Sequence, residues 1–167
     1  MLRTAVLPGS YDPITCGHLH IIGRTSALYD RVTVLLIPNA AKKYRLSVEK
    51  RLLLIQDAVK PLPNVSVDIA EGMLVDYVAA HDYPVIVKGV RNETDFAYEQ
   101  NMAFYNRELS RRKYGNSAET LLMPPDTAYA NISSTLVRTL YDFGSDISDL
   151  VPNAKLFTDL MKSEENA

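Results

Sequence analysis

The sequence predicts an α/β fold in which a doubly wound, five-stranded parallel sheet carries helices on both faces. Short runs rich in β-branched residues alternate with segments whose apolar residues recur at helical spacing. The second of these runs is apolar almost throughout, as expected for a strand covered on both faces. This order of elements implies parallel pairing through right-handed crossovers, and hence a Rossmann-like arrangement.

The first unit is a strand, a sharp loop and a helix. An apolar run at residues 4–7 precedes the loop, and a helical pattern follows at residues 19–28. Gly9 permits a tight turn beyond the strand, and Gly17 leaves room for a ligand where the helix begins. The first N–H groups of a helix lack internal partners, so this corner suits a phosphate, to which His18 could also donate. Residue type alone leaves open that His18 is an ordinary first-turn residue.

A basic loop follows the second strand, which we place at residues 31–37. Lys42, Lys43 and Arg45 come just beyond the carboxyl end of this strand. In open α/β sheets this edge is where ligands bind. A solvated surface loop is the alternative, but the position next to the His18 corner favours contact with an anion.

The other elements follow from the same criteria. Ser47 is a suitable N-cap for a helix that continues to Val59, and Pro61 stops it. We expect strands at residues 65–69, 85–87 and 120–123, a helix near residues 74–79, a long helix from Thr94 or Asp95, a helix after Thr135 and a last helix through Met161. All 167 residues then form one domain, with a frayed tail from about residue 163.

A second cluster of cations follows the strand at residues 85–87. Lys88 and Arg91 flank Gly89, and the two side chains would make a clamp for phosphate. On the long helix that comes next, Glu99 and Asn106 are about two turns apart and share one face. A solvated polar stripe is the simpler interpretation of that face.

Three consecutive hydroxyl residues open the helix that follows the fifth strand. One of Ser133, Ser134 and Thr135 suffices as an N-cap. The others could present hydroxyl and backbone N–H groups to a second phosphate cluster facing His18.

Composition narrows the class of protein. Apolar residues make up 47% and charged residues 23% of the sequence, which is typical of a globular protein. A net charge of −2 argues against a broad nucleic-acid-binding surface, and the single cysteine, Cys16, excludes an internal disulfide framework or a Cys-rich zinc site. No apolar run is long enough for a membrane helix, so we expect a cytoplasmic protein.

The motifs together resemble a known family. Thr15-x-Gly17-His18 after Gly9-x-x-Asp12-Pro13 resembles the T/H-x-G-H signature of the nucleotidyltransferase superfamily. With Lys42, the Gly89-x-Arg91…Asp95-Phe96-x-Tyr98-Glu99 segment and the Ile132–Arg138 run, the chain resembles the bacterial phosphopantetheine adenylyltransferases. The similarity extends from Arg3 to about the final helix.

The resemblance implies that the chain transfers AMP from ATP to 4′-phosphopantetheine, giving dephospho-coenzyme A and pyrophosphate, with Mg²⁺. It implies that His18, Lys42 and Arg91 are catalytic and that Lys42 and Lys88 hold the acceptor phosphate, which Ser10 also meets. It places Leu74, Met102 and Asn106 on the pantetheine arm. The residues implied for the ATP site are Ser10, Tyr11, His18, Gly89, Val90, Arg91, Glu99, Tyr129, Ala130, Asn131, Ile132, Ser133, Ser134 and Thr135.

The chain departs from the family pattern at three positions. Ser10 stands where Thr is usual, Cys16 where Asn or His is frequent, and Lys88 where Arg is expected. The last change keeps the charge but loses the bidentate fork.

The resemblance also implies a homohexamer with feedback by coenzyme A. Apolar residues of the long helix, such as Phe96, Phe104 and Tyr105, would serve as contacts there or in the core.

The acceptor is already an anion, so no general base is needed and direct in-line attack on the α-phosphorus is expected. Cations at the meeting point are then the physical requirement, and we expect His18, Lys42, Lys88 and Arg91 to supply them. Two alternatives stay open. One is a nucleotidyltransferase for nicotinate mononucleotide or glycerol 3-phosphate, and the other is a non-catalytic nucleotide-binding regulator.

Overall fold

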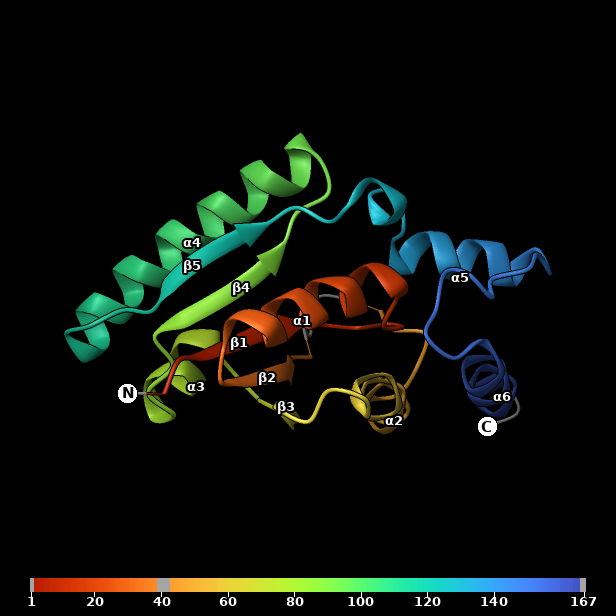
Figure 1. Ribbon diagram of the computed structural model, residues 1–167, viewed down its shortest axis with the longest axis horizontal. Coiled ribbons are helices and arrows are strands. Elements are labelled where there is room, and N and C mark those ends of the chain that lie inside the picture. The colour runs from red at the N-terminus through yellow and green to blue at the C-terminus, as the bar shows by residue number, and fades with distance from the viewer. Residues whose placement is uncertain (1, 39–42, 166–167) are drawn as a thin grey trace.

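The computed structural model describes residues 2–38 and 43–165, and within them five strands form one parallel sheet. The strands lie in the order β3-β2-β1-β4-β5 (Figure 1), so the chain winds outward in both directions from β1. Their bounds are β1 Thr4–Gly9, β2 Arg31–Leu36, β3 Val65–Ile69, β4 Val85–Gly89 and β5 Glu119–Met123. The predicted doubly wound fold is confirmed.

Helices cover both faces of this sheet. Their bounds are α1 Cys16–Leu28, α2 Val48–Val59, α3 Leu74–Ala80, α4 Glu93–Tyr114, α5 Ser134–Asp142 and α6 Ala154–Glu165, with a short 3₁₀ turn, η1, at Thr127–Tyr129. Figure 1 shows α4 running beside β5, while α5 and α6 lie together at the other end of the molecule.

The strands alternate between two apolar cores, as their period of two requires. Ala5 and Leu7 of β1 belong to the larger core, which includes residues of α1, α2 and α6, whereas Val6 belongs to a smaller core with Val78 of α3. β1 is almost completely buried because it lies in the middle of the sheet. Its carboxyl end therefore provides a rigid base for the loop that follows.

The helix boundaries follow from their caps. Ser47 caps α2 as predicted, its hydroxyl accepting a hydrogen bond from the N–H of Lys50. The long helix α4 starts at Glu93, slightly earlier than expected, because the side chain of Asn92 accepts from the N–H of Asp95. At the other end, Gly115 has a φ of 76° and closes α4 with a left-handed turn.

Two observations concern the ends and faces of helices. The tail that we expect to fray from about residue 163 begins within α6, which continues to Glu165. Of the two interpretations of the apolar residues on α4, core packing is excluded, since Phe96, Phe104 and Tyr105 are 45%, 61% and 64% exposed.

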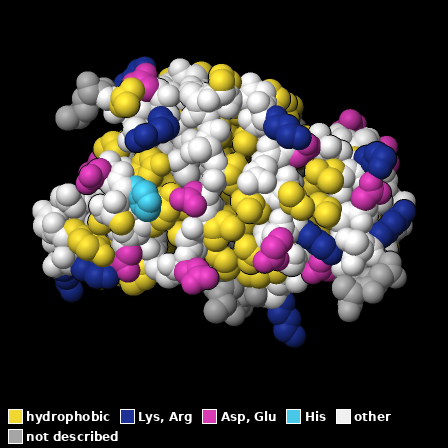
Figure 2. Space-filling model, turned by 90° about the horizontal axis from the view of Figure 1, so that it is seen from below, with side chains coloured by type: hydrophobic (Ala, Val, Ile, Leu, Met, Phe, Trp, Pro, Cys, Tyr) yellow, Lys and Arg dark blue, Asp and Glu magenta, His cyan; other side chains and the backbone are white. Residues whose placement is uncertain are grey.

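The surface shows no segregation of charge on the face seen in Figure 2. Acidic and basic side chains are interspersed there around apolar ones. Over the described part of the chain, no helix combines the length and the apolar character needed to cross a bilayer.

Candidate active site

A cavity of about 570 Å³ lies at the carboxyl ends of β1 and β4. This is the edge of the sheet at which the topology switches direction, where ligands bind in open α/β folds. Of the residues implied for the site, those that line the cavity are Ser10, Tyr11, His18, Lys88, Gly89, Val90, Arg91, Glu99, Tyr129, Ile132, Ser133, Ser134 and Thr135. Three segments distant in the sequence therefore meet around one space.

The loop after β1 is packed from beneath by Tyr11. The Tyr11 side chain is buried, its hydroxyl donates to the carbonyl of Leu7 over 2.9 Å, and burial raises the pKa of the phenol. Its backbone has a φ of 45°, and its ring lies directly against Gly9, where a Cβ atom would come within 2.8 Å. The hydroxyl of Tyr11 is thus engaged inside the protein, and a ligand would meet the backbone of this loop.

A buried arginine supports the same loop from α2. Arg51 is 1% exposed, donates through Nη1 to the carbonyl of Ser10 over 2.8 Å, and stacks on the ring of Tyr44 at 3.9 Å from its centroid. Ser10 and Tyr44 both line the cavity, whereas Arg51 lies behind them. Arg51 therefore fixes the backbone of Ser10 without facing the cavity.

Asp12 joins the first loop to the segment that follows β2. Its carboxylate is 4% exposed and accepts from the backbone N–H groups of Arg45 and Leu46 over 2.9 and 3.1 Å. Arg138 of α5 lies 3.6 Å from the same carboxylate and also donates to the Asp12 carbonyl. One buried carboxylate thus connects the β1–α1 loop, the Arg45 segment and α5.

His18 is held by a capping box at the start of α1. Nδ1 of its ring accepts from the N–H of Thr15 over 3.1 Å, while Thr15 Oγ1 accepts from the N–H of His18. With Nδ1 used as an acceptor, the neutral ring carries its hydrogen on Nε2, where it can donate to a ligand.

The protonation state of His18 corrects one expectation. Burial, followed by the nearby charges of Arg91 and Lys88, lowers the pKa of His18 to about 4. At neutral pH the ring is therefore uncharged. His18 provides a hydrogen-bond donor, and the positive charge at the site comes from lysine and arginine side chains.

The cations that flank Gly89 are both paired with carboxylates of α4. Nζ of Lys88 lies 3.1 Å from Oε1 of Glu99, and Nε of Arg91 lies 2.8 Å from Oδ2 of Asp95. All four side chains line the cavity. The two cations that flank Gly89 thus both lie at the cavity, each beside a carboxylate of α4.

The three hydroxyl residues at the start of α5 make different contacts. Ser133 is the N-cap and accepts from the N–H of Leu136 over 3.0 Å, whereas Ser134 donates to the carbonyl of Pro13 over 2.8 Å. Thr135 Oγ1 lies 3.4 Å from Nη2 of Arg138. The bond from Ser134 brings the α5 terminus against the first loop.

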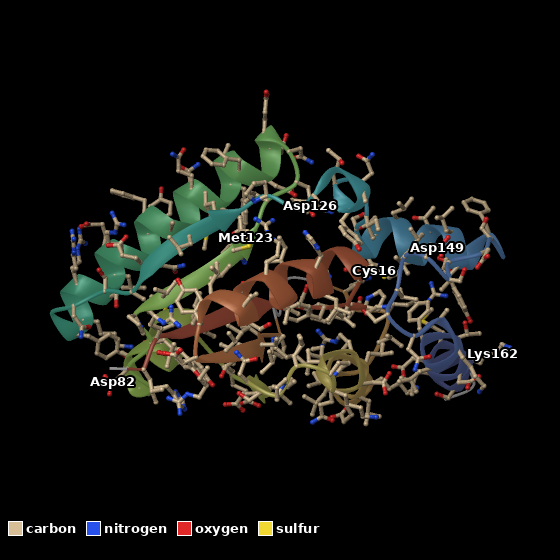
Figure 3. All side chains as sticks on the ribbon, viewed as in Figure 1. Cys16, Asp82, Met123, Asp126, Asp149 and Lys162 are labelled. Carbon is tan, nitrogen blue, oxygen red and sulfur yellow. The ribbon has the colours of Figure 1, made fainter. Side chains whose placement is uncertain are left out.

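A ring stack holds the segment before α5 against α1. His20 stacks on Tyr129 with a centroid distance of 4.5 Å, and its Nε2 lies 3.4 Å from a carboxylate oxygen of Asp126. Asp126 lies beyond the end of β5 (Figure 3). The loop between β5 and α5 is therefore anchored on the side of the cavity that Tyr129 lines.

Not all of the implied site residues are found in the cavity lining. Lys42 is outside the described residues, and the cavity lining does not include Ala130, Asn131, Leu74, Met102 or Asn106.

Cys16, at the start of α1 (Figure 3), is half-buried, and burial together with Asp149 raises the pKa of its thiol. A raised pKa disfavours the reactive thiolate.

Four residues that help to build the site were not predicted as site residues, namely Asp12, Thr15, Arg51 and Arg138. Thr15 carries a local signal, because Thr followed three residues later by a polar side chain is a capping-box pattern. Asp12 and Arg138 lie within the motifs that carry the resemblance. Arg51 gives no local signal, since its partner Ser10 is 41 residues away.

The chain is similar in sequence to proteins of a known family. The family model described as cytidylyltransferase-like matches residues 6–140. A phosphopantetheine adenylyltransferase of Corynebacterium diphtheriae is 44% identical over 154 residues, which is 92% of this chain and 93% of that protein. One from Clostridium novyi is 41% identical over 160 residues and covers 96% of both chains.

A solved structure supports the fold. The crystal structure of a putative nicotinate-nucleotide adenylyltransferase from Vibrio parahaemolyticus superposes with a TM-score of 0.66 and covers 98% of this chain and 94% of its own. Its sequence identity is 18%, so this likeness bears on the fold alone. The identities of 39–44% over more than nine-tenths of the chain carry the assignment. The chain belongs to the phosphopantetheine adenylyltransferase family.

Proposed function

We propose that this chain transfers the adenylyl group of ATP to 4′-phosphopantetheine, giving dephospho-coenzyme A and pyrophosphate, the penultimate step of coenzyme A biosynthesis. The observation that carries the proposal is the convergence of His18, Lys88 and Arg91 on one cavity, in a chain 44% identical to a phosphopantetheine adenylyltransferase. Such a constellation suits two phosphate esters that must approach each other.

The reaction proceeds by direct in-line attack of the acceptor phosphate on the α-phosphorus of ATP. The new bond joins an acceptor oxygen to the α-phosphorus, and the bond to the pyrophosphate oxygen breaks. Because the acceptor is already an anion, no residue has to remove a proton from it. The protein contributes positioning and stabilisation of the charge on the equatorial oxygens. His18 donates through Nε2, while Lys88 and Arg91 provide positive charge.

The cavity is divided between the two substrates. ATP occupies the side formed by the first loop, the Gly89–Arg91 turn, Glu99 and the Tyr129–Thr135 segment. The acceptor phosphate lies near Ser10, Lys88 and Lys42. Leu74, Met102 and Asn106 contact the pantetheine arm beyond the cavity lining. The N-terminus of α5, close to Pro13 through the Ser134 hydroxyl, supports the placement of an anion opposite His18.

Mg²⁺ enters with the nucleotide. Among residues 2–38 and 43–165, no three His, Cys, Asp or Glu side chains form a cluster that could hold a metal ion. In the proposed reaction the Mg²⁺ ion would be held mainly by phosphate oxygens of ATP and by water, as such ions commonly are. It would supply charge neutralisation on the polyphosphate.

Assembly into a homohexamer, and feedback by coenzyme A, belong to the same proposal. The exposed apolar side chains of α4, which include Phe104 at 61% and Tyr105 at 64%, support burial of this helix against other copies of the chain. Light scattering during gel filtration gives the mass of the assembly directly. A monomer would contradict the hexamer and leave the proposed reaction unaffected.

An acceptor screen tests the reaction. Pyrophosphate release is followed with ATP or CTP as the donor and with 4′-phosphopantetheine, nicotinate mononucleotide or glycerol 3-phosphate as the acceptor. The proposal expects rapid release only with ATP and 4′-phosphopantetheine, and dephospho-coenzyme A as the product. Turnover confined to another acceptor, or nucleotide binding without turnover, would overturn it.

A further inference from the structure

Helix α4 supplies both counter-ions of the cationic clamp. Asp95 pairs with Arg91 at 2.8 Å and Glu99 pairs with Lys88 at 3.1 Å. The two acids are four residues apart, so they project from one face of α4 on successive turns. That face borders the cavity, because both acids belong to its lining.

These pairs are shielded from solvent more than ordinary surface ion pairs. The side chains of Lys88 and Glu99 are 24% and 17% exposed, and those of Arg91 and Asp95 are 36% and 28% exposed. By comparison, Lys155 and Asp159 on α6, which have the same i,i+4 spacing as Arg91 and Asp95, are 87% and 56% exposed. Partial burial lowers the effective dielectric and strengthens each contact.

The carboxylates therefore occupy the positions that an incoming anion needs. When a small anion reaches only one of the two cations, that cation exchanges one negative partner for another. The anion therefore gains little binding free energy. A phosphate ester that also accepts hydrogen bonds from His18 Nε2 and from backbone N–H groups gains contacts that the carboxylates do not make.

We propose that Asp95 and Glu99 act as competing counter-anions that keep small inorganic anions out of the active-site cavity. In this way the cavity is reserved for phosphorylated ligands that make several contacts at once. This inference rests on the proposed assignment of the cavity to phosphate groups. It makes Asp95, which was assigned no role above, a residue that determines anion selectivity.

Inorganic phosphate is the direct probe of this role. Its binding to Asp95→Asn, Glu99→Gln and the wild-type protein is measured by isothermal titration calorimetry at an ionic strength of about 0.1 M, where screening extends over about 10 Å. We expect each variant to bind phosphate about twofold to fivefold more tightly, which is the range that loss of one partly exposed ion pair would give.

Glu93→Gln is the matched control. Glu93 shares the first turn of α4 with Asp95 but does not line the cavity. Its substitution removes a similar favourable interaction with the N-terminus of the helix. We expect phosphate affinity to stay at the wild-type value in this variant.

The proposal is overturned if phosphate binds to Asp95→Asn and Glu99→Gln no more tightly than to the wild type, or if Glu93→Gln gains as much. Weaker binding would mean that the acids position the cations instead of competing for them. Should circular dichroism show that one variant is unfolded, the other decides. Binding of phosphate is measured without turnover, so a failed acceptor screen alongside tighter phosphate binding would reject the proposed reaction and retain this inference.

Discussion

The backbone N–H of Thr15 donates to Nδ1 of His18 over 3.1 Å, and the Thr15 hydroxyl oxygen accepts from the His18 N–H in return. This reciprocal pair satisfies two groups at the start of α1 that would otherwise lack partners. It also orients the imidazole and reserves Nε2 as the donor. One local motif thus stabilises the helix and prepares the residue on which we expect turnover to depend.

Substitution of His18 separates these two effects. His18→Ala should lower the rate of pyrophosphate release by roughly 10²–10³-fold, the usual effect of losing a donor to a developing oxyanion. It should also destabilise the fold by about 1 kcal/mol, because the capping box opens. His18→Gln keeps a side chain that can accept from the Thr15 N–H. We therefore expect this variant to be more stable than His18→Ala while its turnover stays as low. Wild-type turnover in either variant would contradict the assigned role.

The depressed pKa of His18 predicts a pH dependence of stability. The pKa is about 4 in the folded protein and close to 6.5 in the unfolded chain. Between these values the unfolded state binds more protons, so the free energy of unfolding rises with pH. Stability should therefore fall as the pH decreases from about 6.5 to about 4. Urea denaturation across this range checks the effect, and His18→Gln, which lacks the titrating ring, should show a shallower slope.

Asp12 should be important for stability because its buried carboxylate holds two backbone N–H groups. In Asp12→Asn one acceptor is replaced by a donor that faces another donor, so we expect a loss of about 2 kcal/mol in the free energy of unfolding. Asp142→Asn is the control, because Asp142 forms an exposed ion pair with the side chain of the same Arg45. We expect this substitution to lower the free energy of unfolding by less than about 1 kcal/mol. Equal losses in the two variants, measured by urea denaturation, would refute the role of Asp12.

Gly9 should not tolerate a side chain. A Cβ atom there would lie 2.8 Å from the Cε2 and Cζ atoms of the buried Tyr11 ring, so the ring or the loop has to move. We expect Gly9→Ala to cost about 1–3 kcal/mol in stability, as overpacking does elsewhere. Gly23→Ala on α1 meets nothing within 4 Å and should stabilise the fold by about 0.5–1 kcal/mol. Thermal unfolding of both variants measures the contrast, and a stable Gly9→Ala would disprove the packing argument.

Much of the fold could be predicted because its signals are local. The β-branched run at Arg31–Leu36 and the cap at Ser47 depend on neighbours within a few residues. The approach of the His18 corner to the Gly89 turn followed from one rule, that parallel strands end at the same edge of a sheet.

The contacts inside the site could not be predicted in the same way. Glu99 forms an ion pair with Lys88 because of the direction in which α4 leaves the sheet. The sequence shows only that Glu99 lies on a helix face and that Lys88 is a cation. The neutral state of His18 depends on its desolvation at the cavity and on the charges of Arg91 and Lys88, which come from a distant part of the sequence. The pairing of Asp12 with Arg45 and Leu46 spans more than 30 residues, so it appears only once the chain is folded.

Arg51 should influence the cavity indirectly, because it holds Ser10 without itself belonging to the cavity lining. Its Nη1 is 2.8 Å from the carbonyl of Ser10, and its guanidinium stacks on Tyr44. Arg51→Lys keeps the charge but loses the planar group that stacks and donates at the same time. We expect this variant to fold with a lowered melting temperature and to show a higher KM for the acceptor, since Ser10 is no longer held in place.

Arg51→Met completes the comparison by removing the donor altogether. The Ser10 carbonyl then loses its charged partner, which should cost about 1–3 kcal/mol in the free energy of unfolding. If Arg51 were only a packing residue, methionine would fill much of its volume and turnover per folded molecule would stay at the wild-type level. A rise in KM that is larger in Arg51→Met than in Arg51→Lys, with folding verified by circular dichroism, distinguishes positioning of Ser10 from simple packing. Unchanged KM values in both variants would refute the positioning role.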